Sequence, residues 1–234
     1  MKQRFFTNVV ANVALVCIIA ALALFTLSAT SANVFKKNDY APVYRGNGNK
    51  VSLMINVYWG TEYLDGMLAI FDKYDVRTTF FVGGSWAAKY PDVLQKIVDG
   101  GHEVGNHGYF HKQQSKLNFD ENKTEILSCE KVVWQLVGKR TALFAPPSGD
   151  FSQATLDAAQ DLSYTTVMWS RDTIDWRDKS WQTVLERATK NTSGGELILM
   201  HPTQHTLQAL EKIVQYYQTN GFVLTTVSDN LQQD

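Results

Sequence analysis

Two histidines, His107 and His111, stand four positions apart in the segment Gly-His-Glu-Val-Gly-Asn-His-Gly-Tyr-Phe-His of residues 101–111. At this spacing on one turn of backbone, both imidazoles can reach a single divalent metal ion. The pair could equally be two ordinary histidines of the surface or the core. A third histidine, His201, and an Asp-Trp pair at residues 175–176 occur later in the chain. Their order along the chain favours the interpretation as metal ligands.

The segments that must position these residues alternate between apolar runs and amphipathic stretches. Such alternation indicates parallel strands joined by crossover helices, in an α/β barrel or an open α/β sheet. We expect an irregular (β/α) barrel of about seven parallel strands, with the candidate residues at the carboxyl ends of strands, where barrel enzymes build their sites. The predicted strands are residues 51–57, 78–82, 103–105, 143–145, 165–169, 197–200 and 222–227. The predicted helices are residues 63–74, 91–98, 122–137, 152–162, 180–189 and 206–220.

The N-terminus carries an almost wholly apolar segment, residues 9–27, preceded by Lys2 and Arg4. A membrane-spanning helix needs about 20 such residues, and a secretory signal has a similar basic start with small residues at its end. We favour an uncleaved anchor within residues 1–32, which predicts a single-pass protein of the cell membrane with an extracytoplasmic domain. Cleavage of the segment would make the protein secreted. Residues 33–49 form a polar linker, and residues 50–234 form the catalytic domain.

Composition supports a packed core and excludes one class of partner. Of the 234 residues, 44% are hydrophobic and 12% aromatic, so disorder is not expected. The net charge of −1 argues against a nucleic-acid-binding surface. Cys17 lies in the apolar segment and Cys129 in a predicted helix, so we expect no disulfide between them and a buried, apolar role for Cys129.

Five motifs in order give the chain a family resemblance over about residues 50–232. The sequence resembles the polysaccharide deacetylases, the NodB-homology group also called carbohydrate esterase family four, and is closest to its sporulation-associated members. Each motif alone is weak, but five at fitting separations are specific. The matches are residues 52–60 to the Thr-Phe-Asp-Asp-Gly motif, 107–111 to His-x3-His, 144–149 to Arg-x-Pro-x-Gly, 172–176 to Asp-x-x-Asp-Trp and 199–202 to Leu-x-His.

The resemblance implies metal-dependent removal of N-acetyl groups from a cell-envelope glycan, either peptidoglycan or a chitin-like polymer. In such enzymes a divalent metal, expected to be zinc, is held by two histidines and an aspartate and polarises the acetamide. A second aspartate acts as base, and a histidine oriented by a further aspartate protonates the leaving amine. Carried over to this chain, the roles are metal ligand for His107 and His111, general acid for His201, orienting partner for Asp175, and substrate contact for Pro146, Pro147 and Trp176.

The first motif departs from the family pattern where the chemistry is most demanding. Asn56 occupies the position of the general base, and a neutral amide cannot accept a proton at neutral pH. Val57 or Tyr58 occupies the place of the metal-binding aspartate, and Ala145 replaces the arginine that would hold the base. Glu62 is the nearest carboxylate that could serve as the third metal ligand, with Asp65 and Asp150 as further candidates.

Three hypotheses follow. The first is a membrane-tethered deacetylase acting on N-acetylated envelope glycan. The second is a catalytically impaired, deacetylase-like protein that binds glycan or an envelope partner, because Asn56, Tyr58 and Ala145 replace expected catalytic residues. The third is a hydrolase of the same fold whose metal or base is built differently, around Glu62.

Overall fold

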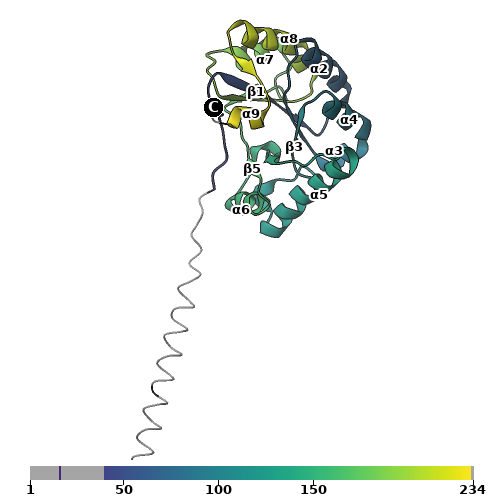
Figure 1. The fold of residues 1–234 in the computed structure, drawn as a ribbon, viewed down its shortest axis with the longest axis vertical. Helices are drawn as coiled ribbons and strands as arrows, with labels where there is room; N and C mark the ends of the chain where they lie inside the picture. Colours follow the sequence, from purple (N-terminus) through teal and green to yellow (C-terminus); the bar gives the residue numbers. More distant parts are fainter. Residues whose placement is uncertain (1–15, 17–39, 233–234) are drawn as a thin grey trace, which may run out of the picture. The chain divides into compact units, whose positions relative to one another are not determined.

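The computed structural model describes residue 16 and residues 40–232, and the latter range forms a parallel sheet flanked by helices (Figure 1). The strand order is β5-β4-β3-β2-β1-β7-β6, with β8 paired to β1, and every pair of strands is parallel. This confirms the predicted α/β fold of parallel strands. The strands are β1 (Lys50–Val57), β2 (Thr79–Val82), β3 (Glu103–Asn106), β4 (Leu143–Phe144), β5 (Thr165–Thr166), β6 (Arg171–Asp172), β7 (Glu196–Met200) and β8 (Val223–Leu224).

The sheet curls into a half-barrel that is open on one side. Its end strands, β5 and β6, are not paired with each other in the described part of the chain. The segment before β1 connects the two sides: Val43 forms a parallel bridge to Val167, and Arg45 forms an antiparallel bridge to Glu196. The compact unit therefore begins at Tyr40, earlier than the boundary at residue 50 that the sequence suggested.

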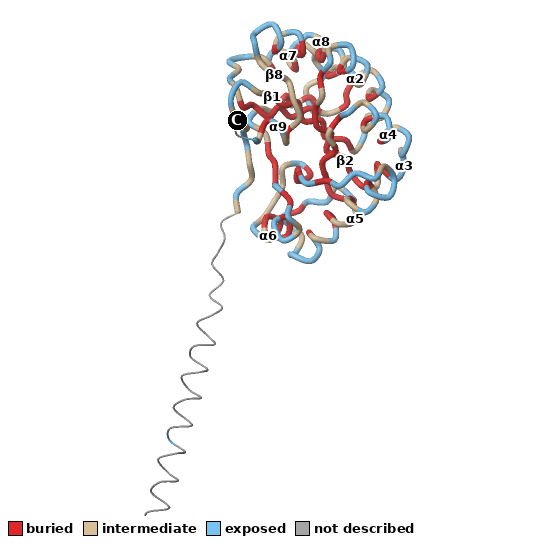
Figure 2. Tube along the Cα trace, viewed as in Figure 1, coloured by how far each residue is buried: buried red, intermediate tan, exposed pale blue. Residues whose placement is uncertain are grey.

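The two faces of the sheet contribute to different apolar clusters. Along β1, Leu53, Ile55 and Val57 pack outward with buried residues of the helices. Met54 points the other way, into an inner cluster with Phe81 and side chains from β4 and β7. Burial on both faces explains why β1 reads as a nearly continuous apolar run, as parallel strands do. Figure 2 shows the buried sheet surrounded by helices whose outer surfaces are exposed.

Helices cover the outer face and mostly match the predicted ones. The α5 helix begins with a capping box, in which Asn118 and Glu121 bond to each other's backbone N–H groups. Two short helices, α3 and α9, were not predicted, since neither is long enough to show helical periodicity. The helices are α2 (Thr61–Lys73), α3 (Gly84–Lys89), α4 (Pro91–Asp99), α5 (Phe119–Val137), α6 (Gln153–Asp161), α7 (Trp181–Thr189), α8 (Gln204–Thr219) and α9 (Val227–Leu231).

The C-terminal helix α9 attaches the end of the chain to the amino end of the sheet. Asn230 is fully buried, and its Nδ2 donates to Ser52 Oγ at 3.1 Å and to the Glu196 carbonyl at 3.3 Å. Its own carbonyl accepts from the Asn47 N–H at 2.9 Å. One residue therefore links β1, β7 and the segment before β1.

Among residue 16 and residues 40–232, no helix is long and apolar enough to cross a membrane. The predicted anchor at residues 1–32 lies, apart from residue 16, outside the described residues, as does Cys17. Cys129 is a buried free thiol, as predicted, and burial raises its pKa to about 12.

Candidate active site at the carboxyl ends of the strands

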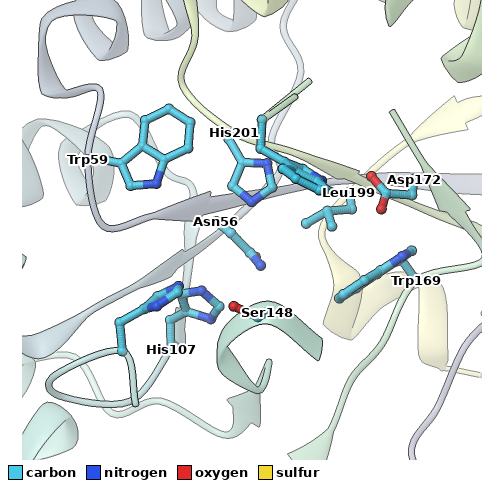
Figure 3. A pocket seen from close by; sticks show the side chains of 10 residues that line it. Asn56, Trp59, His107, Ser148, Trp169, Asp172, Leu199 and His201 are labelled. Atoms are coloured by element: carbon cyan, nitrogen blue, oxygen red, sulfur yellow. The ribbon is translucent and has the colours of Figure 1, made fainter. Parts of the chain in front are cut away.

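A cavity of about 360 Å³ lies at the carboxyl ends of β1, β3, β6 and β7, within the range typical of ligand pockets (Figure 3). We expected the site at this edge of the sheet, where the strands end. It brings together residues far apart in sequence, including both histidines of the His-x3-His motif and the third histidine. The lining residues are Asn56, Trp59, His107, His111, Ser148, Trp169, Asp172, Trp176, Leu199 and His201.

His107 is held as a neutral imidazole with one nitrogen free. It is buried just beyond β3, and its Nδ1–H donates to the Ala145 carbonyl at 2.7 Å. Because Nδ1 carries the hydrogen, the lone pair is on Nε2. Burial, with a smaller contribution from nearby His111, lowers the pKa of His107 to about 3. A backbone carbonyl bonded to the far nitrogen is the usual support of a metal-binding histidine.

His111 reaches the same cavity from a strained loop. Its φ of 55° lies in the left-handed region, and its ring centroid is 5.1 Å from that of His107. Burial lowers the pKa of His111, so both imidazoles of the pair are predominantly neutral at neutral pH. The geometry agrees with the prediction that these two side chains face a common point.

Glu125 of α5 holds the loop that carries His111. Its buried Oε2 accepts the backbone N–H groups of Tyr109 at 3.0 Å and Phe110 at 2.8 Å, and its Oε1 pairs with Lys112 at 2.9 Å. The sequence contained no sign of this role, because the carboxylate comes from a helix and lies 16 and 15 positions after its two partners, which are backbone groups. Glu125 thus positions His111 without entering the cavity.

Replacing Glu125 with Ala is expected to lower the free energy of unfolding by about 2 kcal/mol, since two loop N–H groups lose their buried acceptor. Urea unfolding measures this loss, and limited proteolysis should show faster cleavage within residues 107–113. Glu130→Ala on the same helix is the control, because Glu130 accepts neither of these N–H groups. Equal effects of the two substitutions would contradict the positioning role.

The half-buried His201 and the buried Asp175 form a dyad across the cavity from the histidine pair. The Nδ1–H of His201 donates to Asp175 Oδ1 at 2.7 Å, and the His201 backbone N–H donates to Oδ2 at 2.6 Å. Thr206 of α8 adds a hydroxyl bond to Oδ2 at 2.6 Å. Trp59 stacks on the His201 ring at 5.6 Å and 7°. The imidazole is therefore fixed in orientation, with Nε2 left for a ligand.

The first motif is arranged as the sequence departures suggested. Asn56 lines the cavity, is only 3% exposed, and its Oδ1 has no hydrogen-bond partner among the described residues. Val57 packs in the outer core and cannot reach a metal. Of the two positions that the sequence left open, Tyr58 is the one beside the histidines: its ring lies 4.9 Å from that of His111, and its hydroxyl accepts from Ser85.

Two of the carboxylates that were candidates for the third metal ligand do not reach the cavity. Glu62 is exposed in the first turn of α2 and does not line the cavity, so the structure does not support it as a metal ligand. The left-handed Gly60 turns the chain into α2 just beyond the site, which directs that first turn to solvent. Asp65 pairs with Lys96 at the surface.

Pro146 and Pro147 are buried behind the cavity wall, and Ser148 of the same turn lines the cavity in their place. Ser148 is in the left-handed region, with φ 56°, which the motif alone did not reveal. Trp176 is 55% exposed and lines the cavity, and its role as a substrate contact stays a prediction.

The donor set fits a divalent cation in part. His107 and His111 supply two neutral imidazoles, but within the described part of the chain no three His, Cys, Asp or Glu side chains gather at one point. Catalytic zinc sites ordinarily have three protein ligands. The protein therefore presents two coordinating side chains and lacks the carboxylate that would complete the set.

The parallel half-barrel carries a histidine pair and a His-Asp dyad together at the carboxyl ends of its strands. The family model for polysaccharide deacetylase matches residues 44–167. The chain belongs to the polysaccharide deacetylase family, carbohydrate esterase family four (CE4), whose members hydrolyse amide bonds.

The curated relatives include an uncharacterized protein and a protein named as a deacetylase. The chain is 38% identical to the uncharacterized protein YlxY of Bacillus subtilis over 82% of its length, but spans only 61% of YlxY. It is 30% identical to a peptidoglycan-N-acetylglucosamine deacetylase of Bacillus cereus, covering 82% of this chain and 73% of that protein.

Among solved structures, a CE4 family pseudoenzyme from Bacillus anthracis superposes with a TM-score of 0.80 at 35% identity, covering 83% of this chain and 70% of that one. A mutant of that pseudoenzyme with restored enzymatic activity superposes with the same TM-score at 33% identity, covering 83% of this chain and 72% of that one.

Proposed function

We propose that this protein is a deacetylase-type hydrolase that acts on N-acetyl groups of cell-envelope glycan, with peptidoglycan as the first candidate. The observation that carries the proposal is the Asp175–His201 dyad facing His107 and His111 across one cavity. The Bacillus cereus relative, named as a peptidoglycan-N-acetylglucosamine deacetylase, supports the choice of glycan. Attachment to the membrane through residues 1–32, and a role in a spore envelope, belong to the same proposal and rest on the sequence.

In this proposal His201 supplies the proton. Asp175 accepts the Nδ1–H, which stabilises the charged imidazolium and leaves Nε2 to protonate the departing amine of the sugar. Trp59 and Trp176 offer flat apolar faces on which a sugar ring can pack. A divalent cation, expected to be zinc, would be held by His107 and His111 and would polarise the acetamide carbonyl.

A second candidate function is glycan binding without hydrolysis. It is favoured by Asn56, a neutral amide where the family has a base, and by Tyr58, an aromatic ring where a third ligand would be. The structural likeness to a CE4 family pseudoenzyme supports the same candidate. The cavity and its aromatic wall would then serve recognition alone.

Metal content and acetate release separate the two candidates. We expect the purified protein to bind about one zinc ion per chain and to release acetate from N-acetylglucosamine oligomers or peptidoglycan. His107→Ala should lose both properties, whereas His201→Ala should keep the metal and lose acetate release. A protein that binds neither zinc nor other divalent ions, and that binds glycan equally well with His107→Ala, would be the non-hydrolytic protein of the second candidate.

A further inference from the structure

One end of the cavity carries a carboxylate that the proposed reaction does not use. Asp172 and Trp169 lie together at this end, away from Trp59 (Figure 3). The Asp172 side chain is half-buried, and its Oδ1 accepts the Ile174 backbone N–H at 2.7 Å. Within the described part of the chain, it forms no ion pair. Asp172 therefore presents a carboxylate with unused acceptor capacity to the cavity.

In the described part of the chain, the arginines near Asp172 in sequence have other carboxylate partners. Arg177 and Arg187 both pair with Asp178, at 2.9 Å and 2.6 Å. Burial has the largest influence on the Asp172 carboxyl and raises its pKa, against smaller opposing effects of the Ile174 N–H, His201 and Arg187. The cavity can therefore accept a positive charge at this end.

No other described side chain that lines the cavity forms an ion pair with Asp172. His107 lies away from Asp172 in the cavity, and the Nδ1 of His201 is bonded to Asp175 (Figure 3). The other carboxylate nearby, Asp175, is fully occupied by His201 and Thr206. Asp172 is thus the carboxylate of this cavity that remains open to a ligand.

Trp169 gives the same end an aromatic face that is held in place. A Cβ on Gly149 would lie 2.6 Å from the Trp169 ring, so the indole packs directly against that backbone. The other aromatic faces are partly occupied, since Trp59 stacks on His201 and Arg177 lies 5.8 Å from the Trp176 ring. A cation bound between Trp169 and Asp172 would gain both a cation–π contact and a charge-assisted hydrogen bond.

We propose that the Asp172–Trp169 end of the cavity binds the ammonium group of a de-N-acetylated hexosamine, an inference that rests on the proposed glycan specificity. An N-acetylated sugar is neutral and cannot satisfy Asp172 in this way, whereas a free amino sugar carries the matching charge. The protein would then recognise glycan that has already lost some of its acetyl groups, with a free amino sugar seated at this end.

Calorimetric titration with glucosamine tetramer and N-acetylglucosamine tetramer tests the inference on the full chain near neutral pH. We expect the glucosamine tetramer to bind about tenfold more tightly, and high salt to reduce the difference. Asp172→Asn should abolish the preference, because the amide keeps an oxygen for the Ile174 N–H but loses the charge. Trp169→Phe should reduce the preference through its weaker cation–π face.

Asp65→Asn is the matched control. Asp65 lies on α2, away from the cavity, and the substitution removes the same charge from its exposed ion pair with Lys96. If Asp65→Asn weakens the preference as much as Asp172→Asn, general attraction explains it and the inference is wrong. If both tetramers bind equally and Asp172→Asn changes nothing, the inference fails while glycan binding stands. If neither tetramer binds, the proposed function fails with it.

Discussion

The Asn56→Asp, Tyr58→Asp double variant is expected to release acetate from N-acetylglucosamine oligomers at least about 100-fold faster than the wild-type protein. A positioned general base alone contributes on the order of 10² to 10⁴ in rate. Asn56 already lines the cavity, and its buried Oδ1 lacks a partner. A carboxylate there can accept the proton of an attacking water, which the amide cannot.

The second substitution addresses the missing metal ligand. Tyr58 lies against His111, and a Cβ on Gly83 would meet its ring at 2.3 Å, so the phenol fills the space beside the histidine pair. Aspartate at this position would add a carboxylate oxygen to the two imidazole nitrogens of His107 and His111. Together they would supply the three protein ligands that catalytic zinc sites ordinarily have. We expect zinc affinity to rise by about 100-fold or more, since even the loss of a supporting contact around a metal site typically changes affinity by 10- to 100-fold.

The control is the uncharged variant Tyr58→Asn, in which Asn56 is unchanged. This substitution opens the same space without adding a carboxylate. Acetate release and bound zinc are measured on both variants. If acetate release and zinc binding increase equally in Tyr58→Asn, the space filled by the phenol, and not the missing charge, limits the site. Tight zinc binding by the double variant without faster hydrolysis would show that position 56 cannot act as the base. Ala145→Arg is left out, because Ala145 is fully buried in the inner core and arginine would overpack it.

Replacing Arg171 with Met is expected to lower the free energy of unfolding by about 3 to 5 kcal/mol, because it leaves a buried carboxylate without its cation. The guanidinium donates to both oxygens of Glu196, at 3.1 Å and 2.8 Å, and to the carbonyls of Arg187, Lys190 and Asn191. The two side chains are only 18% and 4% exposed. This pair joins β6 to β7 and to the end of α7.

Urea unfolding measures the loss, with two comparisons. The Arg171→Met, Glu196→Leu double variant should recover much of the stability, since replacing both partners removes the stranded charge. Lys73→Met breaks a solvent-exposed pair with Glu211 and should change little. An Arg171→Met protein as stable as the Lys73→Met protein would mean that water reaches Glu196 in the folded state.

The long elements could be predicted from the sequence because their burial patterns are local. The run at residues 51–57 is β1, and the predicted helix at residues 206–220 is α8 (Gln204–Thr219). Shorter elements depend on tertiary contacts that a pattern does not contain. Of the predicted strand at residues 165–169 only residues 165–166 form a strand, β5, and β6 begins after it at Arg171. The predicted strand at residues 222–227 is shortened to β8, and α9 begins at Val227.

The candidate site shows the same difference between local patterns, which the sequence contains, and tertiary contacts, which it does not. The structure brings His107, His111, Asp175 and His201 to one cavity or its wall, and their grouping could be predicted because their motifs fix residue type and spacing within a few residues. Thr206, Trp169 and Glu125 were missed, since each reaches its partner from another element. Glu62 was chosen for its nearness in sequence to Gly60, but nearness along the chain says little about direction once a helix begins.

The pairing of β1 has a consequence for how the protein is made. Val51, near the start of the domain, pairs with Glu196 and Leu224, and the Ser52 hydroxyl is bound by Asn230. A growing chain cannot complete the central strand of its own sheet until almost all of it has left the ribosome. Until then β1 has an unpaired, apolar edge, which is the kind of surface that other chains add to. Messages that end prematurely, before the codon for Glu196, should therefore yield insoluble products and not smaller folded domains.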